Sequence, residues 1–319
     1  MRKLRAVLIG SSGHGPSFCL GKEYPGLTFT AFAPGDFGER NPGIPKEYAD
    51  WHEMLCKEKP DIAVVDNFYG HHAAPILAAL EQGIHVFAEK PLAGTLAELD
   101  LLEEKWKTSD VQLAAMLNYR VNGAFLRAKQ LIENGTIGEV RLLNAQKSYK
   151  FGRRPDFMSV RESYGGTIPW VGIHAIDWIL WMSNVAPCSV TALQSSVGSE
   201  NGACPEITAL AQFSLEREIM ATLTVDYLRP DAALTHGDDR IRVMGTKGAV
   251  EVRDNAVHLI SESGTQMLPA LTDGDLFASF LAAVRGEGEC AVSAESSFAA
   301  SRAALIAQFA ADTGEKQIF

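Results

Sequence analysis

The sequence predicts an α/β protein with two domains, a doubly wound parallel sheet followed by an α+β domain with an open, mostly antiparallel sheet. In the first 120 residues, short apolar runs alternate with segments of helical periodicity, as in parallel sheets. A glycine-rich turn directly follows the first apolar run. After about residue 190, apolar runs follow one another across Gly and Asp turns, which favours antiparallel pairing. We therefore predict domains at 1–120 and 121–319.

The composition excludes several classes of protein. The 319 residues, 46% of them hydrophobic, are enough for two cores. Lys and Arg number 29 against 39 Asp and Glu, so the net charge is −10, and no basic tract suggests nucleic acid or an anionic membrane surface as a partner. No apolar run reaches the roughly 20 residues of a membrane span, and the N-terminal one is too short for a signal peptide. We expect a cytoplasmic protein.

The cysteines give no sign of a disulfide framework or a metal site. There are five of them, an odd number, and none forms a CxxC pair. We expect no bound metal.

The first predicted strand, Arg5–Ile9, runs into the turn Gly10–Gly15, which reads GSSGHG. Glycines there allow a tight turn and a close approach of the backbone to a phosphate, with N–H donors from the next helix. The spacing is G-x-x-G-x-G, and Ser12 occupies the place of the second glycine in the usual G-x-G-x-x-G. A dinucleotide-binding turn and a plain glycine turn both stay open on this signal alone.

The second predicted strand, Leu27–Ala33, lacks the acidic residue that usually ends it. Dinucleotide-binding sheets place Asp or Glu there to hold the adenosine ribose, but this chain has Pro34. Asp36 could bind a ribose hydroxyl, and Arg40 could meet the 2′-phosphate of NADP. Either residue is equally consistent with a solvated loop charge, so the sequence does not choose between NAD and NADP.

The stretch Ile84–Pro91, IHVFAEKP, is predicted as a buried strand that stops at Glu89, Lys90 and Pro91. Open α/β sheets bind ligands at the carboxyl ends of their strands, so Lys90 is a candidate acid/base group. A solvated Glu-Lys turn is the plain alternative. The glycine turn and the polar run Asn118–Arg120 follow other strands and point to the same crevice. The other elements expected in this half are helices at 51–58, 72–82 and 95–107, the last with a capping box from Thr95 and Glu98, and strands at 61–65 and 111–116.

The second half contains one helix with several chemically active side chains. From Pro169 onward, His174, Asp177 and Trp181 share a face, and Trp170 lies one turn before His174. A buried structural histidine is the alternative to a functional His174. The other elements expected are helices at 121–134, 275–284 and 294–311, a long strand at 140–149 with a polar loop after it, and strands at 190–193, 207–214, 219–227, 240–244, 249–252 and 257–260.

With these motifs in view, the chain resembles the glucose–fructose oxidoreductase, inositol dehydrogenase and rhizopine-catabolism (Gfo/Idh/MocA) family over nearly its whole length. Glu89-Lys90-Pro91 after AALEQGIHVFA is the hallmark of that family. His72, the segment Gly138–Val140, the Gly172-x-His174-x-x-Asp177 helix and the segment Val243–Val252 also fit.

The resemblance implies a Rossmann domain that binds NAD or NADP, followed by an open-faced domain whose sheet is commonly used for homo-oligomer contacts. It implies hydride transfer between the nicotinamide and a secondary alcohol of a sugar, sugar derivative or cyclitol. The expected partners are a small carbohydrate or polyol substrate and further copies of the chain, as a homodimer or homotetramer. It also implies a cis Lys90–Pro91 bond.

Carried over by position, the resemblance implies Lys90 and His174 as catalytic residues. The residues implied to line the dinucleotide are Gly10, Ser11, Ser12, Gly13, His14, Asp36, Asn67, Phe68, His72, Glu89, Lys90 and Asn118. Those implied to face the substrate are Arg120, Tyr149, Arg153, Trp170, His174 and His236.

The chain departs from the family at several of these positions. Trp170 stands where the family has an aspartate that completes the lysine–histidine set, and Phe68 replaces a common proline. We hypothesise that Lys90 and His174 share proton transfer and that Trp170 stacks on the sugar ring. The lost aspartate leaves two alternatives: a glycoside-cleaving enzyme that oxidises, eliminates and re-reduces on one tightly held NAD, and a nucleotide-binding regulatory protein without turnover.

Overall fold

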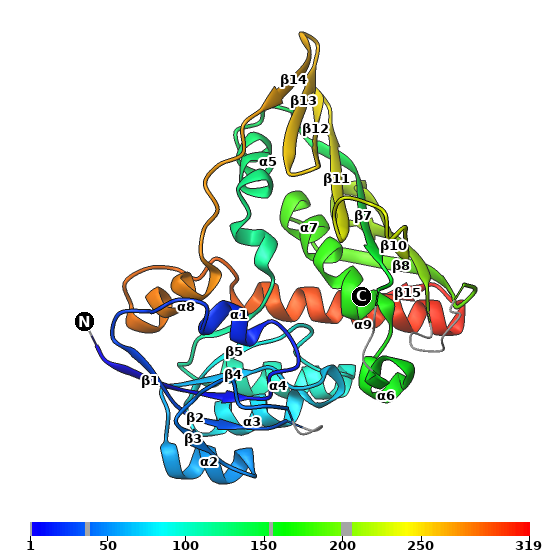
Figure 1. Cartoon of the computed structure of the whole chain (residues 1–319). Coiled ribbons are helices and arrows are strands. Elements are labelled where there is room, and N and C mark those ends of the chain that lie inside the picture. Colours follow the sequence, from blue (N-terminus) through cyan, green and yellow to red (C-terminus); the bar gives the residue numbers. More distant parts are fainter. Residues whose placement is uncertain (1, 36–38, 153–155, 199–205) are drawn as a thin grey trace. The chain divides into compact units, whose positions relative to one another are not determined.

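The computed structural model describes residues 2–35, 39–152, 156–198 and 206–319 (Figure 1). The chain forms two compact units. The first unit consists of Met1–Leu117 and Asp275–Ser301, and the second of Asn118–Gly274 and Arg302–Phe319.

The first unit is built on a parallel sheet, as predicted. Among the described residues this sheet has six strands in the order β3-β2-β1-β4-β5-β6, and each neighbouring pair is parallel. The chain moves outward from β1 in one direction and then returns to β4, so the strand order reverses between β1 and β4. Ligands of doubly wound sheets bind at that point. The strands are β1 (Leu4–Ile9), β2 (Leu27–Ala33), β3 (Lys46–Glu47), β4 (Ile62–Val65), β5 (His85–Ala88) and β6 (Leu113–Ala115).

Helices cover both faces of this sheet (Figure 1). Helices α2 (Trp51–Glu58), α3 (Ala73–Glu81) and α4 (Leu96–Lys107) pack along one face. Helices α1 (Gly15–Cys19) and α8 (Leu276–Arg285) lie together on the other. Thr95 and Glu98 form the predicted capping box at the start of α4.

The segment Asp275–Ser301 packs with the first unit although the sequence pattern suggested one continuous second domain. Phe277 and Phe280 on α8 lie 5.1 and 5.3 Å from the ring of Phe87 on β5. On α9 (Ala294–Thr313), the hydroxyl of Ser297 accepts a hydrogen bond from the Ala115 N–H, and that of Ser301 from the Leu92 N–H. These contacts are long-range, so the local periodicity that predicts the two helices cannot reveal them.

The second unit contains the predicted open and mostly antiparallel sheet. Its nine described strands have the order β14-β13-β12-β11-β7-β10-β9-β8-β15. The pair β7 and β10 is parallel, and the other neighbours are antiparallel. The strands are β7 (Val140–Lys150), β8 (Pro187–Ser195), β9 (Thr208–Leu215), β10 (Met220–Arg229), β11 (Gly237–Gly245), β12 (Gly248–Arg253), β13 (Ala256–Ser261), β14 (Gly264–Leu268) and β15 (Gln317–Ile318).

Two helices cover one face of this sheet. Helix α7 (Ile173–Ser183) packs on β7, β10 and β11, and α5 (Gly123–Glu133) packs on β12 and β13. Along β9 and β10, buried and exposed residues alternate, so one face is core and the other faces outward. The remaining helical segments are η1 (Tyr69–His71), η2 (Asn118–Val121), η3 (Asp156–Ser159), α6 (Arg161–Tyr164), the π-helical η4 (Ile168–Gly172) and η5 (Glu216–Glu218).

None of the helices described is both long enough and apolar enough to cross a membrane.

Candidate active site

The carboxyl ends of three neighbouring strands of the first unit bring polar groups together. The turn Gly10–Gly15 follows β1, Asp66 follows β4, and Glu89 follows β5. The Ser12 N–H donates to the Asp66 carbonyl at 2.9 Å. The glycine turn and the Glu-Lys-Pro segment thus meet at one edge. The third predicted cluster, Asn118–Arg120, begins the second unit.

Two buried carboxylates lie against the glycine turn. Asp66 accepts hydrogen bonds from the N–H groups of Gly13, at 3.0 Å, and Gly15, at 2.9 Å. Glu89 accepts one from the N–H of His14 at 3.0 Å. Burial and the nearby Glu89 raise the pKa of Asp66 to about 7.

The same packing explains why the turn needs glycine. A Cβ atom at Gly10, whose φ is +75°, would lie 2.6 Å from the Cα of Asn67. At Gly13 it would lie 2.7 Å from Asp66 Oδ1 and from Glu89 Cγ. The turn is therefore pressed onto the ends of β4 and β5, where a side chain has no room.

Lys90 is buried at the end of β5, only 3% exposed. Its Nζ lies 3.6 Å from Glu89 Oε2, and the Lys90–Pro91 bond is cis, as predicted. Burial opposes ionisation of Glu89, but Lys90 and His14 hold the pKa of this carboxyl well below its usual range. Glu89 is therefore a carboxylate that connects the glycine turn to the lysine.

Both ring nitrogens of His72 contact backbone carbonyls next to Lys90 and at the end of β4. Its Nδ1 lies 2.7 Å from the Pro91 carbonyl, and its Nε2 lies 2.7 Å from the Asn67 carbonyl. Burial lowers the pKa of the His72 imidazole. The Asn67 amide donates to the His71 carbonyl at 3.0 Å, and Phe68 is buried. Contacts of these residues with a dinucleotide stay predictions.

Glu39 is a residue that the sequence pattern did not single out. Its carboxylate accepts hydrogen bonds from Ser12 Oγ, at 2.6 Å, and from the Gly35 N–H, at 2.8 Å. It therefore joins the end of β2 to the glycine turn, which is the place of the ribose-binding acid in dinucleotide sheets. Asp36, which we predicted for that role, lies outside the described residues, as does Arg153.

In the second unit, a second buried lysine lies in a cage of aromatic rings. Lys147, 0% exposed, has its Nζ 4.7 Å from the ring centre of Tyr119, 4.6 Å from that of Tyr149 and 5.2 Å from that of Trp178. It pairs with Asp239 Oδ1 at 2.8 Å, and the Tyr119 hydroxyl donates to Asp239 Oδ2. Burial and Asp239 raise the pKa of Tyr119, so it is a phenol.

His174 and a polar cavity adjoin this cage. The His174 ring, largely buried on α7, lies 5.6 Å from that of Tyr119. A cavity of about 350 Å³ opens beside Tyr119 and Asp239. Its polar lining also includes Asn122, Thr235, Asp238 and Asn255. Hydroxyl, amide and carboxylate groups beside an aromatic face suit the binding of a carbohydrate.

The other residues predicted to face substrate differ in their surroundings. Trp170 lies in the π-helical turn before α7, with its ring 5.7 Å from Phe157 and 6.0 Å from Tyr164. The rings of Tyr149 and His236 lie 5.1 Å apart. Substrate contacts of these residues stay predictions.

Arg120 has an internal partner. Its Nη2 lies 2.7 Å from Asp177 Oδ1 and its Nε lies 3.0 Å from Asp177 Oδ2, an arrangement in which both guanidinium arms bind one buried carboxylate. The guanidinium also stacks 4.9 Å from Trp181. Burial raises the pKa of Asp177 although Arg120 opposes this shift. A direct substrate contact of Arg120 stays a prediction.

The strand edge of the first unit fits a dinucleotide. The glycine turn lies at the carboxyl end of β1, Glu39 offers a carboxylate beside the end of β2, and Lys90 follows β5. In such sheets the bound dinucleotide supplies the hydride chemistry, and the protein holds and orients the dinucleotide.

Comparisons with known proteins agree with this geometry. Residues 31–117 match the model of an oxidoreductase family with an NAD-binding Rossmann fold, and residues 125–251 match the GFO/IDH/MocA C-terminal domain. The chain is similar to a solved structure from Thermotoga maritima, of a protein designated provisionally as an oxidoreductase. The two are 42% identical with a TM-score of 0.95, over 99% of this chain and 100% of that one.

Two curated relatives are dehydrogenases. A myo-inositol 2-dehydrogenase from Thermotoga maritima is 30% identical over 70% of this chain and 66% of its own length. A trans-1,2-dihydrobenzene-1,2-diol dehydrogenase from Danio rerio is 26% identical over 68% of this chain and 62% of its own length. The chain thus spans less than two thirds of each of these two relatives. The matches to both domains and the Glu-Lys-Pro strand end lead to one conclusion: the chain belongs to the Gfo/Idh/MocA family of oxidoreductases, with an NAD-binding Rossmann domain.

Proposed function

We propose that the chain is an NAD-dependent dehydrogenase that transfers hydride between the nicotinamide and a secondary alcohol of a sugar, sugar derivative or cyclitol. The observation that carries the proposal is Lys90, a buried lysine at the carboxyl end of β5 with a carboxylate at 3.6 Å. The similarity to a myo-inositol 2-dehydrogenase supports a polyol as substrate.

Lys90 exchanges the proton of the reacting oxygen. When bound, NAD would supply the acceptor for the hydride of the alcohol carbon. For oxidation, the Lys90 amine takes the hydroxyl proton; for reduction, the Lys90 ammonium gives a proton to the carbonyl oxygen. Glu89, whose Oε2 lies 3.6 Å from Nζ, positions the Lys90 side chain. We assign His174 a share in this proton transfer and Trp170 a stacking contact with the ring of the substrate.

We propose NAD rather than NADP as the coenzyme. The Glu39 carboxylate lies between the end of β2 and the glycine turn, held by Ser12 and Gly35. A carboxylate there accepts hydrogen bonds from ribose hydroxyls and repels a 2′-phosphate. In Glu39→Gln we expect the ratio of NADP to NAD affinity to rise about tenfold, which corresponds to 1.4 kcal/mol.

The test is a screen of myo-inositol, other polyols and aldoses with each nucleotide, followed by absorbance of the reduced nicotinamide. Steady formation of NADH supports the dehydrogenase. Release of a free sugar from a glycoside without net NADH would instead indicate the redox-neutral cycle, for which Trp170 in place of the family aspartate is the motivating observation. Tight nucleotide binding with no turnover on the whole panel would indicate a regulatory protein.

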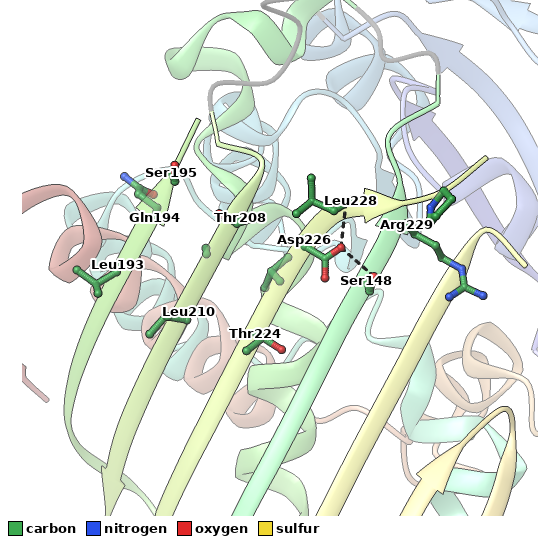
Figure 2. Close-up of a pocket in the computed structure, with 13 residues that line it drawn as sticks. Ser148, Leu193, Gln194, Ser195, Thr208, Leu210, Thr224, Asp226, Leu228 and Arg229 are labelled. Atoms are coloured by element: carbon green, nitrogen blue, oxygen red, sulfur yellow. Dashed lines mark hydrogen bonds between the residues drawn. The ribbon is translucent and has the colours of Figure 1, made fainter. Parts of the chain in front are cut away.

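We also propose that the open face of the second unit's sheet binds a second copy of the chain. Leu193 on β8, Leu210 on β9 and Leu228 on β10 line a groove of about 630 Å³ on this face. Figure 2 shows these three side chains along the strands. All three leucines are exposed, as is Met220 on the same strand as Leu228. Contiguous exposed apolar patches mark interaction sites.

Light scattering after gel filtration tests this interface. In the double variant Leu210→Lys with Leu228→Lys we expect the mass to fall to that of one chain, because two buried ammonium groups per copy oppose association. Met267→Lys, at an exposed position on β14, is the matched control and should leave the mass unchanged. An unchanged mass in the double variant would contradict the proposal.

A further inference from the structure

Four backbone N–H groups of the glycine turn, those of Ser12 to Gly15, are already used inside the first unit. From Ser12 to Gly15, four successive N–H groups donate to the carbonyl and carboxylate of Asp66 and to the carboxylate of Glu89, at 2.9 to 3.0 Å. In a phosphate-binding turn such groups are the donors to the ligand. In this arrangement these four groups are not available to the pyrophosphate of a dinucleotide.

The serine hydroxyls of the turn are also engaged. Ser11 Oγ donates to the Arg40 carbonyl at 3.1 Å, and Ser12 Oγ donates to Glu39 at 2.6 Å. A hydroxyl has a single proton to donate. In this arrangement neither serine offers that proton to a phosphate.

The side chain of His14 is differently placed. It is 61% exposed, and its Nδ1 lies 2.5 Å from Glu89 Oε1, which leaves Nε2 on the far side of the ring. Glu89 is the main cause that raises the pKa of His14, through both its charge and the hydrogen bond, while burial and Lys90 oppose the shift and Asp66 adds to it. The other neighbour is the uncharged ring of Phe18, 6.3 Å away.

We propose that the imidazolium of His14, charge-balanced by Glu89, is the group through which this turn binds the pyrophosphate of the dinucleotide, in place of the backbone N–H groups. The inference concerns coenzyme binding and rests on the family assignment, not on the choice of substrate. Its consequence is that binding is linked to a proton. Nε2 carries a donor proton and a positive charge below the pKa of His14, and loses both above it.

Binding should therefore weaken as the pH rises. If the ligand binds the imidazolium form, the Kd of a pyrophosphate compound increases tenfold for each pH unit above the pKa of His14. ADP-ribose is the suitable probe because it keeps the pyrophosphate, has no nicotinamide, and has no phosphate proton to lose between about pH 6 and 9. Adenosine, which has no phosphate, should bind with a Kd that does not depend on pH.

Isothermal titration of the whole protein with ADP-ribose and adenosine, from pH 6 to pH 9, tests the inference. In His14→Gln we expect weaker ADP-ribose binding at pH 6 and a flat pH profile. In His14→Lys we expect binding to be kept at pH 8 with little pH dependence, because a fixed cation replaces a titrating one. His52→Gln on α2, another exposed histidine of the first unit, is the matched control and should behave as the wild type.

Asp66 is the group that could imitate this behaviour, since it titrates near pH 7 and its charge would also repel a pyrophosphate. The variant Asp66→Asn separates the two: it should keep the pH dependence of ADP-ribose binding if His14 is responsible. An ADP-ribose profile that is unchanged in His14→Gln, or is flattened only in Asp66→Asn, would overturn the inference. An active dehydrogenase with either result would leave the proposed function intact.

Discussion

The two units each bury a lysine, and the two lysines differ in how their charge is held. Lys90 in the first unit and Lys147 in the second are 3% and 0% exposed. The Nζ of Lys147 has a carboxylate at 2.8 Å and three aromatic rings within 5.2 Å. The Nζ of Lys90 lies 3.6 Å from the carboxylate of Glu89, which also pairs with His14.

This difference indicates separate roles for similar residues. A close ion pair with Asp239 inside a cage of aromatic rings stabilises the packing around Lys147, so we infer a structural role for this lysine. The pair of Lys90 and Glu89 is longer, and it lies at the kind of strand edge where doubly wound sheets bind ligands, so we propose a role for Lys90 in the reaction. Burial alone therefore does not distinguish the two lysines, whereas the distance from Nζ to the paired carboxylate does.

Substitution of Lys90 should have the largest effect, and on rate rather than on stability. In Lys90→Met we expect kcat to fall by about 10³-fold, because loss of a positioned acid/base group costs 10² to 10⁴. We expect NAD affinity to change by less than about threefold, because the groups that we propose for its ribose and pyrophosphate, Glu39 and His14, are unchanged. Stopped-flow or steady-state rates on the best substrate of the screen, with nucleotide titrations, measure both quantities. A variant with full turnover would remove Lys90 from the mechanism.

Substitution of Lys147 should act on stability. Lys147→Met leaves Asp239 without its cation in a mostly buried position, and we expect the free energy of unfolding to fall by about 3 kcal/mol. Urea unfolding followed by circular dichroism gives this number. Adding Asp239→Asn to Lys147→Met should restore part of the lost stability, because the unpaired negative charge of Asp239 is then removed. If Lys147→Met lost less than about 1 kcal/mol, the two lysines would not differ as we infer.

A buried carboxylate that accepts backbone N–H groups makes a third case. Asp66 is held by N–H groups, and burial and Glu89 raise its pKa to about 7. Because the folded state then binds this proton more tightly than the unfolded state, the stabilising effect is present below the unfolded pKa, near 4, and is lost as the pH rises to 7. We expect a loss of about 3 kcal/mol over that range.

The variant Asp66→Asn isolates this effect. Its overall stability will differ, since an amide cannot accept both N–H groups, but the slope of stability against pH between 4 and 7 should become flatter than in the wild type. Urea midpoints at several pH values measure the slope. Equal slopes in the two proteins would show that Asp66 ionises normally.

These cases also show how far the sequence alone could go. The parallel sheet, the capping box at Thr95 and the strand that ends at Glu89 follow from local periodicity and capping chemistry, and the structure has them. Lys90 stands out because it follows an apolar strand within a recognisable motif. The short strands β3 and β14 were not predicted, because two and five residues with exposed side chains give no apolar pattern.

The partners of the charged residues were not predictable in the same way. Lys147 sits in a strand where alternation suggests an ordinary polar position, and its partner Asp239 is 92 residues later in the sequence. Glu39 meets Ser12 only because β1 and β2 are neighbours. Tertiary contacts of this kind have no local signature, so a motif identifies a candidate residue and the fold decides which charges compensate it.

The smallest effect should come from a lysine pair on the surface. Lys107 and Glu103 are one helical turn apart on α4, with 2.7 Å between Nζ and Oε1, a shorter distance than in the Lys90 pair. The Lys107 side chain is 61% exposed, so water and salt screen the charge. In Lys107→Ala we expect a change of less than about 0.5 kcal/mol in the free energy of unfolding, and less still at 1 M salt. Urea unfolding of Lys107→Ala and Lys147→Met under the same conditions compares the two losses in stability. If Lys107→Ala lost as much stability as Lys147→Met, the distance between the charges, rather than burial and the aromatic cage, would determine how much these ion pairs stabilise the protein. The inferred difference between Lys90 and Lys147 would then lose its support.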